Sequence, residues 1–148
     1  MANLPVYQPE ADNTKCNLFV ADFANTVFDC STFDGLLANQ IVLDALKLQN
    51  TFKPLYDRTK NLTDRTAAFQ NAQSYANTGY LIVYGWYNNA GHGHVMVGVP
   101  GQLQHGWSGN EVPTVAQAGT LVSAAMKLSE GLSMEKGDSD SFVVYGWI

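Results

Sequence analysis

The chain has 148 residues, of which 46% are hydrophobic and 14% are charged, and its formal net charge is −5. This length suits a single domain, 1–148, with enough apolar residues for a sizeable core. The 8 Lys and Arg residues are scattered along the chain. A nucleic acid or an anionic membrane is therefore not an expected partner, because both need a concentrated basic patch. No stretch approaches the ~20 apolar residues that cross a bilayer, so we expect no membrane insertion.

The N-terminal segment 1–12 lacks the basic start and the apolar stretch of a secretory signal peptide. We therefore expect synthesis in the cytoplasm, and any work outside the cell needs another exit route. Cys16 and Cys30 are the only cysteines, which is too few for a disulfide framework, and we expect no bridge between them. Cys30 has no helix start or nearby basic residue to favour it as a nucleophile.

The segment 14–23 predicts a helix with Cys16 in its first turn. Asn13 or Thr14 can cap the first backbone N–H groups, and apolar residues recur at three, four, seven and eleven positions after Cys16. Cys16 is therefore expected on the inward stripe and at the positive end of the helix, where the dipole and free N–H groups favour the thiolate. The alternative is a plain buried cysteine, since cysteine is among the most buried residue types.

Two further helices are expected in the first half of the chain. One covers 37–48 and is broken by Pro54 and the polar stretch 57–60. The other begins near Thr63 or Asp64, either of which can cap it, and ends in the glycine C-cap of 77–79.

The second half of the chain is richer in strand-forming residues. The segments 80–86 and 94–99 predict a hairpin, and strands are also expected around 112–116 and over 142–147, whereas 121–132 fits either a helix or irregular structure. The sequence Val-Tyr-Gly-Trp occurs in both the first and the last of these strands, which indicates two strands of one sheet. Helices followed by strands predict an α+β fold, with the Cys16 helix packed on a mostly antiparallel sheet and its N-terminus at one edge.

His94 is the strongest candidate for a base among the three histidines, His92, His94 and His105. It opens a predicted strand after a glycine-rich turn, and its imidazole titrates in the range that a base for a thiol requires. Strand alternation places His94 on the same face as Met96 and Gly98, where the small glycine leaves room for the cysteine helix. The alternative is a surface or structural histidine at a strand end.

Four segments, in this order, carry a resemblance to a known family: 15–20 (KCNLFV), 93–97 (GHVMV), 107–109 (WSG) and 112–119 (VPTVAQAG). Together they resemble the NlpC-type papain-like amidases of peptidoglycan, a group that includes CHAP domains, phage lysins and the amidase effectors of type VI secretion systems. The resemblance implies a circularly permuted papain-like fold in which Cys16 is the nucleophile and His94 the base. It also implies a polar residue on the strand after the histidine strand, for which Ser108 is the first choice, with His105 and Asn110 as competitors.

The resemblance further implies hydrolysis of an amide bond in the peptidoglycan stem peptide by a thiol mechanism, without a metal or other cofactor. Either a phage lysin or an injected effector would act in the periplasm or on the cell wall, after phage delivery or export by a route other than the Sec pathway. An injected effector would be paired with a dedicated inhibitor protein.

Three other functions stay open at the level of the sequence. His92, His94 and His105 could supply the three nitrogen ligands of a zinc-dependent wall hydrolase, although the nearest carboxylate is Glu111. A non-catalytic module could bind the wall or a partner protein through aromatic residues, which at strand spacing more often belong to the core; the candidates are Tyr84, Trp86, Trp107 and Trp147. A different thiol acyl-transfer enzyme could use the same fold.

Overall fold

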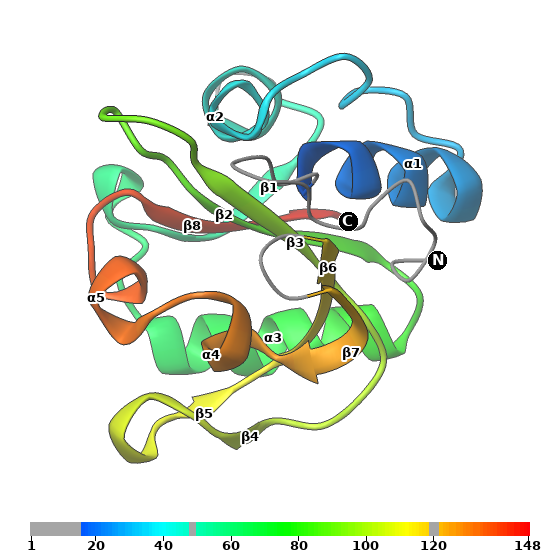
Figure 1. The fold of residues 1–148 in the computed structure, drawn as a ribbon. Coiled ribbons are helices and arrows are strands. Elements are labelled where there is room, and N and C mark those ends of the chain that lie inside the picture. Colours follow the sequence, from blue (N-terminus) through cyan, green and yellow to red (C-terminus); the bar gives the residue numbers. More distant parts are fainter. Residues whose placement is uncertain (1–15, 48–49, 119–121) are drawn as a thin grey trace.

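The computed structural model describes residues 16–47, 50–118 and 122–148 of the chain (Figure 1). The fold is α+β, with the N-terminal helices packed on a six-stranded sheet in which the strand pairs are antiparallel. The sheet has the order β1-β8-β2-β3-β6-β7. Its strands are β1 (Lys53–Asp57), β2 (Leu81–Trp86), β3 (His94–Gly98), β6 (Thr114–Ala118), β7 (Val122–Lys127) and β8 (Phe142–Trp147). A separate two-stranded sheet pairs β4 (Gln104–His105) with β5 (Glu111–Val112).

The helices lie on both faces of the large sheet, with α1 and α2 on one face and α3, α4 and α5 on the other (Figure 1). The α2 helix continues directly into a π-helix, η2. The helical segments are α1 (Cys16–Phe28), α2 (Ala38–Gln40), η2 (Ile41–Lys47), η3 (Arg58–Lys60), α3 (Arg65–Asn77), η4 (Trp107–Gly109), α4 (Leu128–Gly131) and α5 (Met134–Gly137). Among the helices of the described residues, none has the length and hydropathy needed to cross a membrane.

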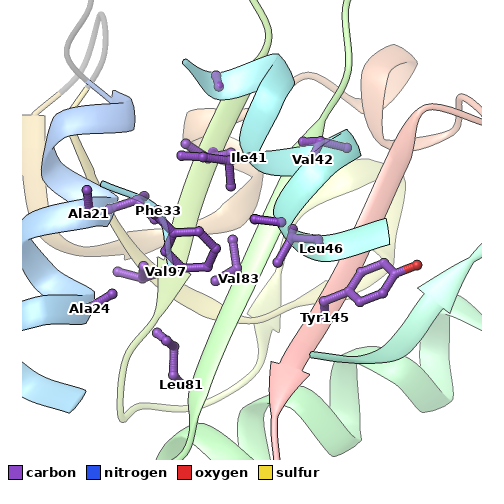
Figure 2. Packing of buried hydrophobic residues seen from close by; sticks show 14 of the residues in the cluster. Ala21, Ala24, Phe33, Ile41, Val42, Leu46, Leu81, Val83, Val97 and Tyr145 are labelled. Atoms are coloured by element: carbon purple, nitrogen blue, oxygen red, sulfur yellow. The ribbon is translucent and has the colours of Figure 1, made fainter. Parts of the chain in front are cut away.

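Each face of the sheet has its own apolar core. The α1-side core includes Cys16, Phe19, Val20 and Ala24 of α1, Ile41, Val42 and Leu46 of η2, and Val83, Val95, Val97 and Ala116 of the sheet. Figure 2 shows this packing, in which side chains of α1 and η2 meet strand residues such as Val83 and Val97. The α3-side core includes Phe69, Ala72 and Ala76 of α3, Tyr84 and Met96 of the sheet, Trp107 and Phe142. Successive residues of β3 thus alternate between the two cores, as a pleated strand buried on both faces requires.

The predicted helices are present, with one change in type. The helix expected after residue 63 is α3, in which the Asp64 carboxylate accepts a hydrogen bond from the Ala67 N–H at 3.0 Å, and Gly79 follows its end with φ of 95°. The helix expected over 37–48 is formed by α2 and the π-helical η2. The predicted Cys16 helix is α1, whereas its expected caps, Asn13 and Thr14, lie outside the described residues.

The expected hairpin and the last strand are confirmed. The strand β2 pairs with β3 and with β8, so that the two Val-Tyr-Gly-Trp segments lie side by side in one sheet. The undecided segment 121–132 forms β7 and the single turn α4, apart from residue 121, which lies outside the described residues.

The described helix ends at Lys47, before Pro54, as expected, but the segment around Pro54 forms an edge strand, β1, that the sequence did not predict. Pro54 pairs with Tyr145 of β8, and the register shifts between Pro54 and Tyr56. Only one side of an edge strand is paired, so a residue without an N–H is tolerated there, and the irregular register accommodates it. Pro54 is therefore compatible with a strand here, although it is incompatible with the interior of a helix.

Candidate active site

Cys16 begins α1 and is 2% exposed, in the α1-side core. The α1 helix packs against β3 and β6. Cys16 also borders a cavity of about 500 Å³, which we call the thiol cavity. The cavity is lined by Cys16, Asn17, Leu37, Ala38, Asn39, Gln40, Gly91, His92 and Gly93. Two side-chain amides in this lining, those of Asn17 and Gln40, are each bonded at one atom, to Leu36 and Leu37, and their other amide groups can bond to the backbone of an extended peptide.

His94 begins β3 and is half-buried at the same end of the sheet. Its Nε2 atom lies 2.5 Å from Oε1 of Gln117 on the neighbouring strand β6. Because an amide oxygen only accepts, Nε2 is the donor in this bond, and Nδ1 is then the acceptor of the neutral ring. Burial lowers the pKa of His94, the hydrogen bond to Gln117 opposes this, and the positive charge of Lys136 lowers the pKa further. The imidazole is therefore neutral, and able to accept a proton, at neutral pH.

A second cavity, of about 190 Å³, lies beside this imidazole, and we call it the imidazole cavity. It is lined by Trp86, His92, Gly93, His94, Gly131, Leu132 and Lys136. His92 and Gly93 line the thiol cavity as well. The segment formed by His92 and Gly93 therefore separates the cavity beside the start of α1 from the cavity beside the start of β3.

The predicted packing of the cysteine helix against Gly98 is wrong. A Cβ on Gly98 would lie 3.1 Å from Ile82 and 3.5 Å from Ala76 of α3, so the space beside it belongs to the α3 side. The cysteine helix packs instead on the face of Val95 and Val97. The valine side chains offer an apolar surface for α1, whereas the glycine lets α3 approach closely. Consequently Cys16 lies on one face of the sheet, whereas the His94 imidazole lies on the other face, beside Gln117.

Asn39 of α2 fixes the loop between β2 and β3. Its Nδ2 donates to the carbonyl oxygens of Asn88, at 2.8 Å, and Gly91, at 2.9 Å, and its Oδ1 accepts from the Asn88 N–H at 2.9 Å. Gly93 is needed in this arrangement, because a Cβ there would lie 2.2 Å from Asn39 Oδ1 and 2.6 Å from the Trp86 carbonyl oxygen. Asn39 therefore positions the segment that separates the two cavities.

Gln117, which the sequence analysis did not single out, occupies the place expected for the third site residue. Ser108 instead lies exposed in the η4 turn, with φ of 46°, between the two strands of the small sheet. His105 and Asn110 are also exposed there. The expectation assumed that the next strand along the chain is the neighbour of β3, but β4 and β5 form their own sheet and β6 is that neighbour. The sequence held one signal: Gln117 is the one long polar side chain in the strand TVAQA.

The zinc alternative lacks a ligand set in the described part of the chain. There, no group of three or more His, Cys, Asp or Glu side chains is arranged to bind a metal ion. His105 is placed on β4, and Nε2 of His94 is engaged by Gln117.

Of the four aromatic residues suggested for a binding surface, two are interior. Tyr84 and Trp107 are buried, and the Trp107 indole N–H donates to the Leu132 carbonyl oxygen at 2.9 Å. Trp86 is half-buried, and Trp147 is 39% exposed.

Both cysteines are free thiols, as expected, and both are buried. The fold and the site define an α+β protein with a thiol and a neutral imidazole at one end of its sheet. Neither the models of known protein families nor the curated proteins give a match to this sequence.

Proposed function

We propose that this protein is a cysteine amidase or endopeptidase of peptidoglycan, with Cys16 as nucleophile, His94 as base and Gln117 as the residue that orients the imidazole. One observation carries the proposal: the cavity lined by Cys16 and the cavity lined by His94 share two lining residues, His92 and Gly93. A nucleophile, a base and a group that orients the base are the parts that thiol catalysis needs.

The protonation state of the imidazole suits this role. Nε2–H is held by Gln117, so Nδ1 is the nitrogen that takes the thiol proton. The proposal requires Nδ1 and the Cys16 sulfur to come within hydrogen-bond reach when substrate is bound. Such catalytic bonds are often long or poorly aligned before the substrate arrives.

The reaction proceeds in two halves. The Cys16 thiol transfers its proton to Nδ1 of His94, and the sulfur attacks the carbonyl carbon of the amide. The C–N bond then breaks as His94 returns the proton to the leaving amine, which leaves a thioester on Cys16. His94 next takes a proton from water, the resulting hydroxide attacks the thioester, and the proton returns to the sulfur as the acid leaves.

The helix terminus assists both halves. The oxyanion of each tetrahedral intermediate forms at the N-terminal end of α1, where the helix dipole is positive. Donors aimed at such an oxyanion are typically worth ~3 kcal/mol each in the transition state.

Two features support the peptide of the bacterial wall as substrate. The side-chain amides of Asn17 and Gln40 line the thiol cavity and match the hydrogen-bonding groups of a peptide backbone. The motifs around Cys16 and His94 resemble those of the peptidoglycan amidases. In this proposal the protein is a phage lysin or an injected effector, acts in the periplasm or on the wall, and in the second case is neutralised by a dedicated inhibitor protein.

The test is digestion of purified peptidoglycan, followed by mass spectrometry of the released fragments. We expect the wild-type protein to release fragments in which one amide bond has gained water, and the Cys16→Ala variant to release none. Cys30→Ala is the matched control, because Cys30 is also a buried thiol but does not border the thiol cavity. Thermal unfolding of each variant shows whether it is folded. A folded Cys16→Ala variant with wild-type activity would overturn the proposal.

A further inference from the structure

The imidazole cavity carries a positive charge that its surroundings leave unneutralised. The Lys136 ammonium lies 4.6 Å from the centroid of the Trp86 ring, and its side chain is exposed. Within the described residues no carboxylate lies at ion-pair distance from Lys136, whereas other cations are paired. These pairs are Lys47 with Asp57, Arg58 with Asp140 and Arg65 with Asp138.

The fold holds this lysine in place through its helix. The Ser133 hydroxyl oxygen accepts from the Lys136 backbone N–H at 3.3 Å and caps α5. At the other end of α5, the Arg65 guanidinium donates to the Gly137 carbonyl oxygen at 2.9 Å and pairs with Asp138. Gly137 lies directly against Trp107, where a Cβ would be 2.3 Å from the ring. The position of α5 is thus set by contacts with α3 and with the core.

We propose that the imidazole cavity is a subsite for a carboxylate of the substrate, and that Lys136 binds this carboxylate beside His94. An ammonium resting on an aromatic face keeps N–H donors free for an anion. The half-buried Trp86 supplies an apolar wall for the carbons that bear the carboxylate. The subsite therefore selects a peptide with a free carboxylate close to the amide bond that is cut, and in that respect the inference rests on the proposed function.

A matched pair of substrates tests the subsite. One is a peptidoglycan-derived muropeptide with free carboxylates, and the other is the same muropeptide with its carboxylates converted to primary amides. For the free form, we expect Lys136→Gln to raise KM on the order of tenfold with little change in kcat, because a charge-assisted hydrogen bond is lost. Lys136→Arg should retain most of the wild-type KM. For the amidated form, wild type and Lys136→Gln should have the same KM.

Lys60→Gln is the matched control, since Lys60 also lies over an aromatic ring, that of Tyr145, but outside both cavities. It should leave the KM of both substrates unchanged. An equal effect of Lys136→Gln on both substrates would overturn the subsite while leaving the proposed function intact.

A binding measurement separates the two proposals. Calorimetric titration of the Cys16→Ala variant with each muropeptide should show tighter binding of the free carboxylate form. This preference should be lost in the Cys16→Ala/Lys136→Gln variant. If wild type cuts neither muropeptide but this preference is found, the subsite stands and the hydrolase proposal fails. Equal affinity for the two muropeptides would overturn the subsite.

Discussion

The imidazole of His94 and the side-chain amide of Gln117 face each other across neighbouring strands, with 2.5 Å between Nε2 and Oε1. This contact fixes which ring nitrogen carries the proton and leaves the other as the acceptor. The Gln117 side chain is also held, since it lies near Met96 and Gly131. The ring is therefore oriented by a buried group in the proposed site.

Gln117→Leu should remove this orientation while filling most of the same volume. Because general base catalysis typically contributes 10²–10⁴-fold, we expect the rate to fall by about 10-fold to 100-fold when the base is no longer oriented. Gln117→Glu should instead raise the pKa of His94, since a carboxylate favours the imidazolium. Titration of the His94 ring by NMR measures this shift. An unchanged pKa in Gln117→Glu would show that the contact does not control the ring.

The pH dependence of hydrolysis should reflect the lowered pKa of His94. The base must be neutral to accept a proton. The midpoint of the acid limb in the pH–rate profile should therefore lie below pH 6.5, the usual pKa of histidine in peptides. Lys136→Gln removes a positive charge that lowers this pKa, so the limb should move to higher pH. An acid limb that does not move in Lys136→Gln would contradict the assignment of the limb to His94.

The same shift predicts a dependence of stability on pH. Because the folded state favours the neutral ring, the contribution of His94 to the free energy of unfolding has its full value above pH 6.5. It is lost as the pH falls from 6.5 through the lower pKa of His94 in the folded state. Urea unfolding as a function of pH should therefore show a loss of stability on acidification that is smaller in His94→Gln. An identical pH dependence in the two proteins would rule out this contribution.

The loop between the two cavities should tolerate a methyl group at Gly91 but not at Gly93. A Cβ on Gly93 would collide with Asn39 and with the Trp86 carbonyl oxygen, whereas one on Gly91 would lie 3.4 Å from its nearest neighbour, Asn88. We expect Gly93→Ala to cost about 1–3 kcal/mol of unfolding free energy, as overpacking usually does. Gly91→Ala should be close to neutral. Urea unfolding measures both, and equal effects would show that Asn39 does not hold the loop rigidly.

Removing a hydrogen-bond donor from the buried Asp57 carboxylate, at the other edge of the sheet, should lower stability without changing activity. The Tyr145 hydroxyl donates to Asp57 at 2.6 Å, and the Asp57 side chain is fully buried. Tyr145→Phe leaves a buried acceptor without this donor, which should cost about 1–3 kcal/mol of unfolding free energy. Because β8 is separated from β3 by β2, kcat/KM measured at a temperature where the variant is folded should not change. A large fall in kcat/KM would show that this edge is coupled to the site.

The sequence predicted those parts of the fold that local patterns control. The cap at Asp64, the glycine after α3 and the strand-forming runs around Tyr84 and Tyr145 each act over a few residues. The edge strand β1 was missed because Pro54 breaks helices and central strands but not edges. Whether a proline lies at an edge depends on the strand order of the whole sheet.

The site was predicted less completely, for a similar reason. The sequence places His94 at a strand start, which is confirmed, and places Cys16 in a helix, of which it is the first described residue. Gln117 was missed because the neighbour of β3 is chosen by long-range pairing, which skips β4 and β5. The face on which α1 packs was also mispredicted, since alternation divides a strand into two faces but does not say which helix covers each.

The most direct test of the central claim is the rate of muropeptide hydrolysis by wild type, Cys16→Ala, His94→Ala and the double variant. Residues that act as a unit give losses that do not multiply. We expect each single variant to lose nearly all activity and the double variant to lose no more. Wild-type activity in either folded single variant, or single losses that multiply in the double variant, would contradict a shared role for the thiol and the imidazole.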